Sequence, residues 1–206
     1  MPGIRSISFS TEGWTLGEES AAKLAWGNGL GDILSLNFIA LRPDLPSSLS
    51  ELLAIRGMYR AHLAPVDGAL VEVEPEEIAS VPVLRTIFKF PQRPHGMSYV
   101  GKFTIPRAEF SFVIKVSCAE RGVTGMRDAV ALDRHLATNP DPIFRGWAQD
   151  PYDPTFESPT LRNQSDDEEW DALFPEHPLS RVRAGLGKLR ASVVIGDDVR
   201  ASRPWS

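Results

Sequence analysis

Three consecutive segments of alternating apolar and polar residues constrain this chain more than any other feature. They read VPVLRTIFKF (residues 81–90), GMSYVGKFTIP (96–106) and FSFVIKVSC (110–118), with short connections between them. A period of two places successive side chains on opposite faces of a strand, and short connections favour antiparallel neighbours. The pattern predicts an antiparallel meander packed with helices, which is an α/β fold of the α+β kind.

The alternation divides the meander into two faces of different chemistry. Aromatic side chains are frequent on one face, which we expect to pack in the core, and Cys118 continues that face as a buried thiol. The other face is predicted to carry a basic stripe made of Arg85, Lys89, Lys102 and Lys115. Two interpretations of the stripe are open. It is either a polar face covered by solvent or a helix, which is the more common arrangement, or a surface that binds a partner.

Turn and capping signals place the elements before the meander. Asn28-Gly29 is typical of a hairpin turn, and the apolar run after it supplies the returning strand. The glycines around this turn do not have the spacing of a phosphate-binding loop. Ser48 and Glu51 match a capping box, which predicts a helix from there to about Ala64.

Three further helices are predicted after the meander. Thr124 is expected to cap a helix that ends before Asn139 and whose narrow apolar side lies on the sheet. Ser165 and Glu168 match a second capping box, which predicts a short acidic helix. Ser180 is expected to cap the last helix, whose two glycines make it dependent on tertiary contacts.

Composition describes an ordinary globular protein. The chain has 206 residues, of which 42% are hydrophobic and 24% are charged, and its net charge is −5. The negative charge gives no reason to expect a nucleic-acid partner. No basic and apolar leader begins the chain, and no apolar run reaches the roughly 18 residues that a membrane helix needs. With a single cysteine, these features predict a soluble cytoplasmic protein without a membrane partner.

Local patterns in the first two thirds of the chain carry a resemblance. FSTEGW near the start, LSLNFIALRPDLPSSLSEL, and the hairpin GALVEVE with VPVLRTIFKF resemble the PsbP-like fold superfamily over about residues 1–138. The resemblance implies a domain whose role is partner binding and assembly more often than catalysis. No motif that contacts a known partner of that superfamily is matched residue by residue. The resemblance therefore implies no specific partner.

Composition changes at the boundary between residues 1–138 and residues 139–206. Eight of the 17 prolines lie in the second part, and the sequence there has turn chemistry without a helical period. Trp147, Tyr152 and Phe156 are too apolar for a simple linker. We expect an irregular arm whose aromatic side chains attach to a surface, either this protein's own or a partner's, with two short helices that pack on the same domain.

A cluster of acidic residues in the arm complements the predicted basic stripe. Its members are Asp166, Asp167, Glu168, Glu169 and Asp171. Opposite charges suggest that this cluster docks on the stripe and covers it until a partner displaces the arm, although single surface ion pairs contribute little.

Chemistry-bearing residues do not form a recognisable catalytic or metal-binding motif. The four histidines, at positions 62, 95, 135 and 177, fall in different predicted elements. Cys118 with His135 is the one nucleophile and base pair close enough in sequence to consider, and it is disfavoured. The sequence predicts a non-catalytic binding or accessory protein that needs no cofactor or metal and acts on a protein partner. The alternative is a small hydrophobic-ligand module with a pocket at Tyr99, Phe103 and Phe112.

Overall fold

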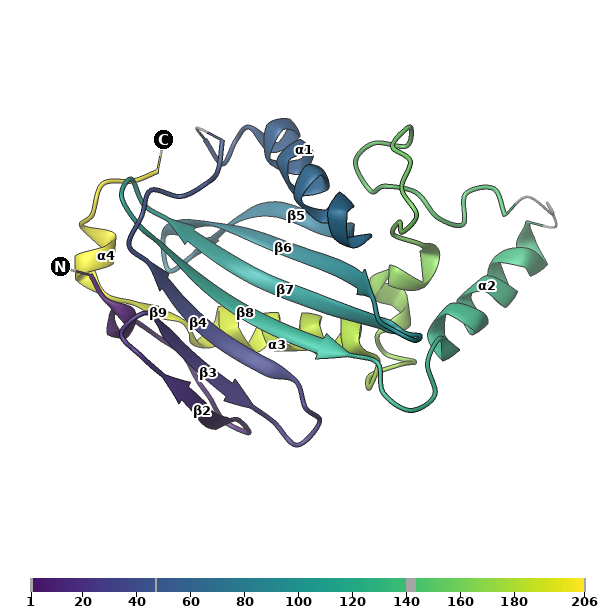
Figure 1. The fold of residues 1–206 in the computed structure, drawn as a ribbon, viewed down its shortest axis with the longest axis horizontal. Helices are drawn as coiled ribbons and strands as arrows, with labels where there is room; N and C mark the ends of the chain where they lie inside the picture. The colour runs from purple at the N-terminus through teal and green to yellow at the C-terminus, as the bar shows by residue number, and fades with distance from the viewer. Residues whose placement is uncertain (1, 47, 140–143, 206) are drawn as a thin grey trace.

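A central antiparallel sheet organises the protein (Figure 1). The computed structural model describes residues 2–46, 48–139 and 144–205, and within them the sheet has seven strands in the order β2-β3-β4-β8-β7-β6-β5. The strands are β2 (Thr15–Glu19), β3 (Lys23–Gly27), β4 (Ile33–Ile39), β5 (Ala69–Ile78), β6 (Val81–Pro91), β7 (Met97–Pro106) and β8 (Ser111–Ala119). The predicted α+β class and the meander, which is β6-β7-β8, are confirmed.

Helices and short elements surround this sheet. The α-helices are α1 (Leu52–Leu63), α2 (Met126–Thr138), α3 (Pro178–Ser192) and α4 (Asp197–Arg200). The 3₁₀ helices are η1 (Ile4–Ser6), η2 (Ala64–Val66), η3 (Gln164–Asp166) and η4 (Glu168–Trp170). A separate two-stranded ribbon joins β1 (Ile7–Ser8) to β9 (Val194–Ile195), so that the two ends of the chain lie side by side. None of the helices in the described ranges combines the length and apolar character that crossing a bilayer requires.

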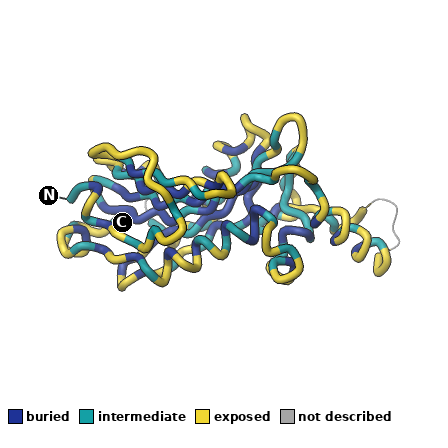
Figure 2. Tube along the Cα trace, turned by 90° about the horizontal axis from the view of Figure 1, so that it is seen from below, coloured by how far each residue is buried: buried dark blue, intermediate teal, exposed yellow. Residues whose placement is uncertain are grey.

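Helix α3 covers one face of the sheet and contributes to the main core. Figure 1 shows α3 running behind the sheet, across β7 and β8. Buried side chains of β7 and β8 such as Phe103 and Ile114 lie in one cluster with Val182 and Leu186 of α3. Figure 2 shows the buried segments as a continuous layer flanked by exposed loops. Core residues therefore come from both sides of the predicted boundary at residue 138.

Helix α3 begins two residues before the predicted cap. His177, and not Ser180, occupies the N-cap position, where its Nδ1 accepts a hydrogen bond from the Leu179 N–H at 3.3 Å. Pro178 follows at the first helical position, where its missing N–H leaves no donor unsatisfied. Ser180 is instead buried inside the first turn, and its hydroxyl donates to Asp171.

Helix α1 covers only part of the opposite face. Ile55, Tyr59 and Leu63 of α1 are buried with Leu84 and Phe88, in a second, smaller cluster over β5 and β6. In Figure 1 no helix runs along β8 and β4 on this side, and β7 is reached by α1 side chains such as Tyr59, whose ring lies 4.8 Å from Lys102 Nζ. The side chains of these strands on this side are mostly half-buried, such as those at the alternate positions of β8. We call this uncovered part of the sheet the open face.

The start of α1 differs from the predicted capping box. The helix begins at Leu52 with Glu51 as its N-cap residue, and no side-chain hydrogen bond caps it. The Ser48 hydroxyl accepts instead from the Ser50 N–H at 3.2 Å, two residues before the helix. A short hydroxyl side chain forms this local turn readily, and the turn competes with the capping geometry.

Helix α2 does not lie on the sheet as predicted. It begins after Gly125, one residue beyond the expected cap Thr124, and it projects from one end of the sheet to pack on η3. Its buried side chains are Arg127, Ala131 and His135, which recur every four residues. The buried face is therefore mostly polar, and an apolar count could not identify it.

Two 3₁₀ helices replace the predicted short acidic helix. Ser165 and Glu168 do not form a capping box; the Asn163 side chain caps η3 instead and accepts a hydrogen bond from the Ser165 N–H at 2.9 Å. A second 3₁₀ turn, η4, follows directly. The Ser165 side chain is fully buried and bonds to Asp128, which removes it from a capping role.

The register of the meander divides the predicted basic stripe between two faces. Lys89 lies opposite Tyr99, and Arg85 lies opposite Phe103, so both project on the α3 side. Lys102 lies opposite Lys115, and both project on the open face. The single four-residue stripe was wrong because the aromatic residues of β6 lie on the other face from those of β7 and β8. Alternation within each strand does not define how neighbouring strands align.

Gly101 on β7 provides a test of the packing of α3. A Cβ at this position would lie 2.5 Å from Val182 Cγ1 and 2.8 Å from Leu186 Cδ1. We expect Gly101→Ala to reduce the free energy of unfolding by about 1–3 kcal/mol, because the helix must move away from the sheet. Urea denaturation measures the change.

Gly187 on the same helix is the matched control. A Cβ there meets nothing within 4 Å, so Gly187→Ala should stabilise the protein by about 0.5–1 kcal/mol through helix propensity. Equal stabilisation by both substitutions would show that α3 does not pack closely on β7.

Candidate binding surfaces

The basic residues on the α3 side of the sheet form ion pairs within the protein. Lys89 is 2% exposed, and its Nζ lies 2.6 Å from Asp166 Oδ2. Arg85 pairs with Glu72 at 2.5 Å and with Glu76 at 2.7 Å, and both of these carboxylates come from β5 beside it. Neither of the predicted partner-binding residues Arg85 and Lys89 is therefore an available charge on the surface.

The Asp166 carboxylate is the centre of the internal network. It is fully buried and accepts hydrogen bonds from Lys89 Nζ at 2.6 Å, from the Tyr99 hydroxyl at 2.9 Å and from the Asn163 N–H at 3.0 Å. Burial alone would raise its pKa, but the charge of Lys89 and the three donors hold the pKa below its usual value. Asp166 therefore stays ionised and attaches η3 to β6 and β7.

Arg127 extends this network to helix α3. Its fully buried guanidinium donates to the Ser165 carbonyl at 2.5 Å, the Asp167 carbonyl at 2.9 Å and Asp171 Oδ1 at 2.8 Å. It also donates to the Ser180 hydroxyl at 2.7 Å. The guanidinium has five N–H donors in a fixed plane, which suits it to connect several backbone segments at once.

The acidic cluster therefore does not dock on a basic surface stripe. Only Asp166 of this cluster meets a stripe residue, Lys89, and that pair is in the interior. Other members pair with arginines outside the stripe, as Glu169 does with Arg134. A fully buried pair cannot act as a displaceable surface contact, so the occlusion hypothesis fails in its predicted form.

The aromatic residues of the arm contact the protein's own domain. The Val73 N–H donates to the Tyr152 hydroxyl at 2.6 Å, and the guanidinium of Arg56 lies 3.5 Å from the Tyr152 ring centroid. The Trp147 ring lies 5.7 Å from that of His135. Because Arg56 also donates to the Val73 carbonyl at 3.1 Å, this part of the edge of β5 has both polar groups satisfied.

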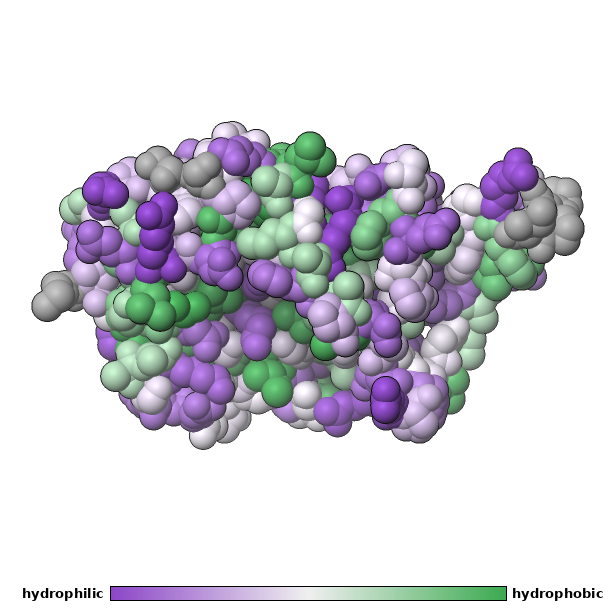
Figure 3. All heavy atoms as spheres, turned by 45° about the horizontal axis from the view of Figure 1, so that its top comes forward, coloured by the Kyte–Doolittle hydropathy of each residue, from purple (hydrophilic) through white to green (hydrophobic). Residues whose placement is uncertain are grey.

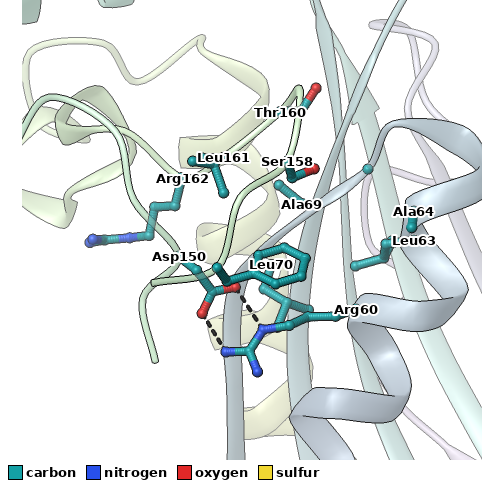
Figure 4. Close-up of a pocket in the computed structure, with 12 residues that line it drawn as sticks. Arg60, Leu63, Ala64, Ala69, Leu70, Asp150, Ser158, Thr160, Leu161 and Arg162 are labelled. Atoms are coloured by element: carbon teal, nitrogen blue, oxygen red, sulfur yellow. Dashed lines mark hydrogen bonds and ion pairs between the residues drawn. The ribbon is translucent and has the colours of Figure 1, made fainter. Parts of the chain in front are cut away.

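An ion pair attaches the arm to α1 near Phe156. Arg60 Nε and Nη2 donate to the two carboxylate oxygens of Asp150 at 3.0 and 2.5 Å, as Figure 4 shows. The Arg60 guanidinium also lies 5.2 Å from the Phe156 ring. The cavity left between the arm, α1 and β5 has a volume of only ≈10 Å³, about that of one water position. The three predicted arm residues Trp147, Tyr152 and Phe156 thus have internal structural contacts.

Cys118 and His135 are not brought together. Cys118 is buried, as predicted, beside Asp32 and Arg181. His135 lies on α2, where its Nδ1 is 3.0 Å from Gln164 Oε1. Burial and the Asp32 carboxylate raise the pKa of the Cys118 thiol to about 12, so the thiolate required for nucleophilic attack is not formed near neutral pH.

The ligand pocket predicted at the aromatic face is filled by helix α3. Tyr99, Phe103 and Phe112 are at most 1% exposed. A cleft of ≈730 Å³ lies farther along the same face, between α3, β4 and the loop that carries Trp14. Leu34 and other apolar residues line this cleft, and its volume is in the range of small-molecule sites.

A separate apolar groove of ≈480 Å³ lies at the end of the molecule that carries α2. Its walls come from the β3–β4 turn, the start of α2 and the segment before α3. Four large apolar side chains on these walls are exposed to solvent: Leu30, Val123, Met126 and Leu173. Charged residues such as Arg121 and Glu176 border the groove. An apolar area with a charged border is typical of a protein contact site.

Sequence reasoning did not identify these four groove residues. They come from positions as distant as 30 and 173, and no periodic apolar pattern links them. Isolated apolar residues are common on protein surfaces and carry no signal by themselves. On the face shown in Figure 3, hydrophobic residues form small patches separated by hydrophilic ones. Only the fold brings the groove residues together.

Metal-ligating side chains are not clustered in the part of the chain that the structure describes. Across the ranges that the structure describes, no three His, Cys, Asp or Glu side chains are placed to hold a metal ion. His177, at the wall of the groove, has Nδ1 occupied by the helix cap and Nε2 3.8 Å from Glu120. The contacts of His177 therefore serve the structure of the helix start.

Comparisons with known proteins provide no relative. No protein-family model matches the chain, and no curated protein matches it. A solved structure from Bacteroides thetaiotaomicron aligns with a TM-score of 0.35 and 9% identity, over 57% of this chain and 40% of the other. The chain thus spans about two fifths of that protein's length. A likeness this weak carries no argument, and the PsbP-like resemblance stays a prediction.

Because Asp166 is the centre of a buried network, we expect a single substitution there to lower the free energy of unfolding strongly. Asp166→Asn removes the charge that compensates Lys89, and we expect the free energy of unfolding at pH 7 to fall by about 3–5 kcal/mol. In the wild type, the depressed pKa means that this contribution is present above the unfolded value of 3.8 and is lost as the pH falls further. Denaturant titrations at pH 7 and pH 3 measure both effects.

Glu169→Gln is the control in the same segment. Its ion pair with Arg134 is more than half exposed on both sides, so the loss should stay below about 1 kcal/mol. Similar losses for Asp166→Asn and Glu169→Gln would contradict the central position of Asp166.

We expect His177 to add a second pH dependence to the free energy of unfolding. Burial and the charge of Arg127 lower its pKa from 6.5 to about 4. The unfolded chain therefore takes up a proton near pH 6.5, while the folded protein stays neutral until about pH 4. Stability should fall as the pH decreases through this window, by at most about 1.4 kcal/mol per pH unit.

His177→Asn isolates this contribution. Asparagine retains an acceptor for the helix cap but does not titrate. The difference in unfolding free energy between the wild type and this variant should change between pH 7 and pH 4.5 and be constant from pH 7 to pH 8. A constant difference over the whole range would show that His177 is not held neutral.

Proposed function

We propose that this protein is a non-catalytic binding or accessory protein that acts through protein–protein contacts, and that the apolar groove is its docking site. One observation supports this proposal above others: Leu30, Val123, Met126 and Leu173 are exposed around a single groove although they come from three separate segments. Exposing apolar surface to water is unfavourable, and contiguous exposed patches are typical of interaction sites.

The shape of the groove favours a protein partner over a small ligand. Val123 is 79% exposed and Leu173 is 67% exposed, so an occupant of small size would remain largely in water. Small-molecule sites bury about 70–90% of their ligand. A partner that inserts an apolar side chain and covers the border with polar groups would bury both. A cytoplasmic location belongs to the same proposal, and the buried unpaired Cys118 is compatible with it.

A small hydrophobic-ligand module is the second candidate function. The ≈730 Å³ cleft beside α3 supports it, because the cleft has an apolar floor that includes Leu34, Val116 and Leu189. Its polar pair is Asp32 with Arg181, joined by hydrogen bonds of 3.0 and 2.9 Å. This cleft does not include Val123 or Leu173, so substitutions in the groove distinguish the two candidates.

Charged substitutions in the groove test the proposed function. A partner captured by the full chain is purified, and its dissociation constant is measured by calorimetry with the wild type and with the double variant Val123→Asp/Leu173→Asp. Two buried apolar contacts at an interface centre together contribute about 2 kcal/mol or more, so we expect binding to weaken about thirtyfold or more.

Leu53→Asp is the matched control, because Leu53 is 82% exposed on α1 and outside the groove. It should bind the partner like the wild type. Equal binding by the double variant would refute the groove as the docking site. Concentration-dependent dimers that the double variant abolishes would identify a second copy as the occupant, and a small hydrophobic compound that both variants bind would favour the cleft.

A further inference from the structure

Four strands place polar residues in one row across the open face. Thr86 of β6 is opposite Lys102 of β7, Lys102 is opposite Lys115 of β8, and Lys115 is opposite Ser35 of β4. Directly opposite residues on one face have Cβ atoms about 4.5–5.5 Å apart. Two hydroxyl side chains therefore flank two adjacent ammonium side chains.

The lysine pair lacks a compensating charge from the protein. Among the described residues, no carboxylate lies within ion-pair distance of Lys102 or Lys115, and the charge that acts on Lys102 is that of Lys115. Like charges directly opposite in a sheet are destabilising. Other basic residues of this sheet, such as Lys89 and Arg85, are paired at 2.5–2.7 Å. The missing counter-charge therefore distinguishes Lys102 and Lys115 from Arg85 and Lys89 on the same sheet.

Aromatic rings hold the Lys102 side chain in place. Its Nζ lies 4.8 Å from the centroid of the Tyr59 ring of α1 and 5.0 Å from that of Phe88 of β6. An ammonium near a ring face is attracted by the negative charge there, and this attraction favours the protonated form. Burial and Lys115 act in the other direction and lower the pKa of Lys102 to about 8.

Thr86 provides a second and independent observation. Its side chain is fully buried, and its hydroxyl has no hydrogen-bond partner among the described residues. Buried polar groups are nearly always bonded, so an unpartnered hydroxyl on the residue opposite Lys102 indicates a missing acceptor. One anionic oxygen ligand would satisfy both requirements.

We propose that Lys102 and Lys115 bind a phosphate dianion on the open face, with the Thr86 hydroxyl as an additional donor. Two negative charges match two ammonium groups, and the several oxygens of a phosphate can accept from both lysines and from a hydroxyl. Lys102 and Lys115 are half-buried and reach solvent, while Thr86 is fully buried, so a phosphate must displace neighbouring side chains to reach its hydroxyl. The site is independent of the proposed function, because it shares no residue with the apolar groove.

The affinity for phosphate should depend on pH because of the groups around Lys102. Lys115 on β8 carries a second positive charge, and the Tyr59 hydroxyl on α1 is neutral because burial and Asp44 raise its pKa to about 12. Binding requires protonated Lys102, so affinity for phosphate falls as the pH rises through about 8. Bound phosphate in turn raises the pKa of Lys102.

Titration with inorganic phosphate tests the proposal. Calorimetry of the full chain at pH 7, against sodium chloride of equal ionic strength, should show saturable binding of phosphate. Lys102→Gln and Lys115→Gln should each weaken it about tenfold or more, as expected for loss of a charge-assisted hydrogen bond. Arg190→Gln removes the same charge from the exposed surface of α3, and we expect no change in affinity for this control.

NMR of the wild type gives a second measurement that does not depend on how the variants fold. The side-chain signals of Lys102 should shift on addition of phosphate, and its titration midpoint should move upward from about 8. Binding that is no stronger than that of chloride, equal affinity in all three variants, or an unchanged Lys102 midpoint would each overturn the proposal.

Discussion

The fold depends on one fully buried carboxylate. Asp166 lies in the protein interior, where it accepts hydrogen bonds from Lys89 and Tyr99. These bonds attach the segment that leads into α3 to the sheet. A buried charge is tolerated only when opposite charge and donors surround it, so the sheet and this segment require each other. Arg127 strengthens the connection because it joins α2, η3 and α3 through separate donors. Residues 144–205 are therefore part of the main structure and not an appendage.

Internal pairing on this scale determines what the surface can offer a partner. The arm's aromatic residues and most basic residues of the sheet satisfy contacts within the chain. Among the described residues, the apolar groove beside α2 and the Lys102–Lys115 pair on the open face are exceptions. The groove has apolar side chains that are exposed to solvent, and the lysine pair has positive charge without a carboxylate partner in the described part of the chain. Both are incomplete in the monomer, and each would be completed by a ligand of a different kind.

The meander and the burial of Cys118 follow from local alternation, and they could be predicted from the sequence. The arrangement of the basic residues could not be predicted in this way, because it depends on how β6 aligns with β7. The alternation of residues such as Phe88 and Lys89 along β6 does not define that register. Capping patterns failed at Ser48 and Ser165 because short hydroxyl side chains found other partners. The groove joins residues more than 140 positions apart, so only the tertiary structure reveals it.

Native-state hydrogen exchange tests most directly whether residues 144–205 and the sheet form one unit. If Asp166 locks them together, the slowest amides of α3 and of β7 will exchange with the same opening free energy, equal to that of global unfolding. Their protection should also decrease together when denaturant is added. Exchange of α3 with a markedly lower opening free energy than β7 would show that the C-terminal region opens by itself, and it would contradict the account.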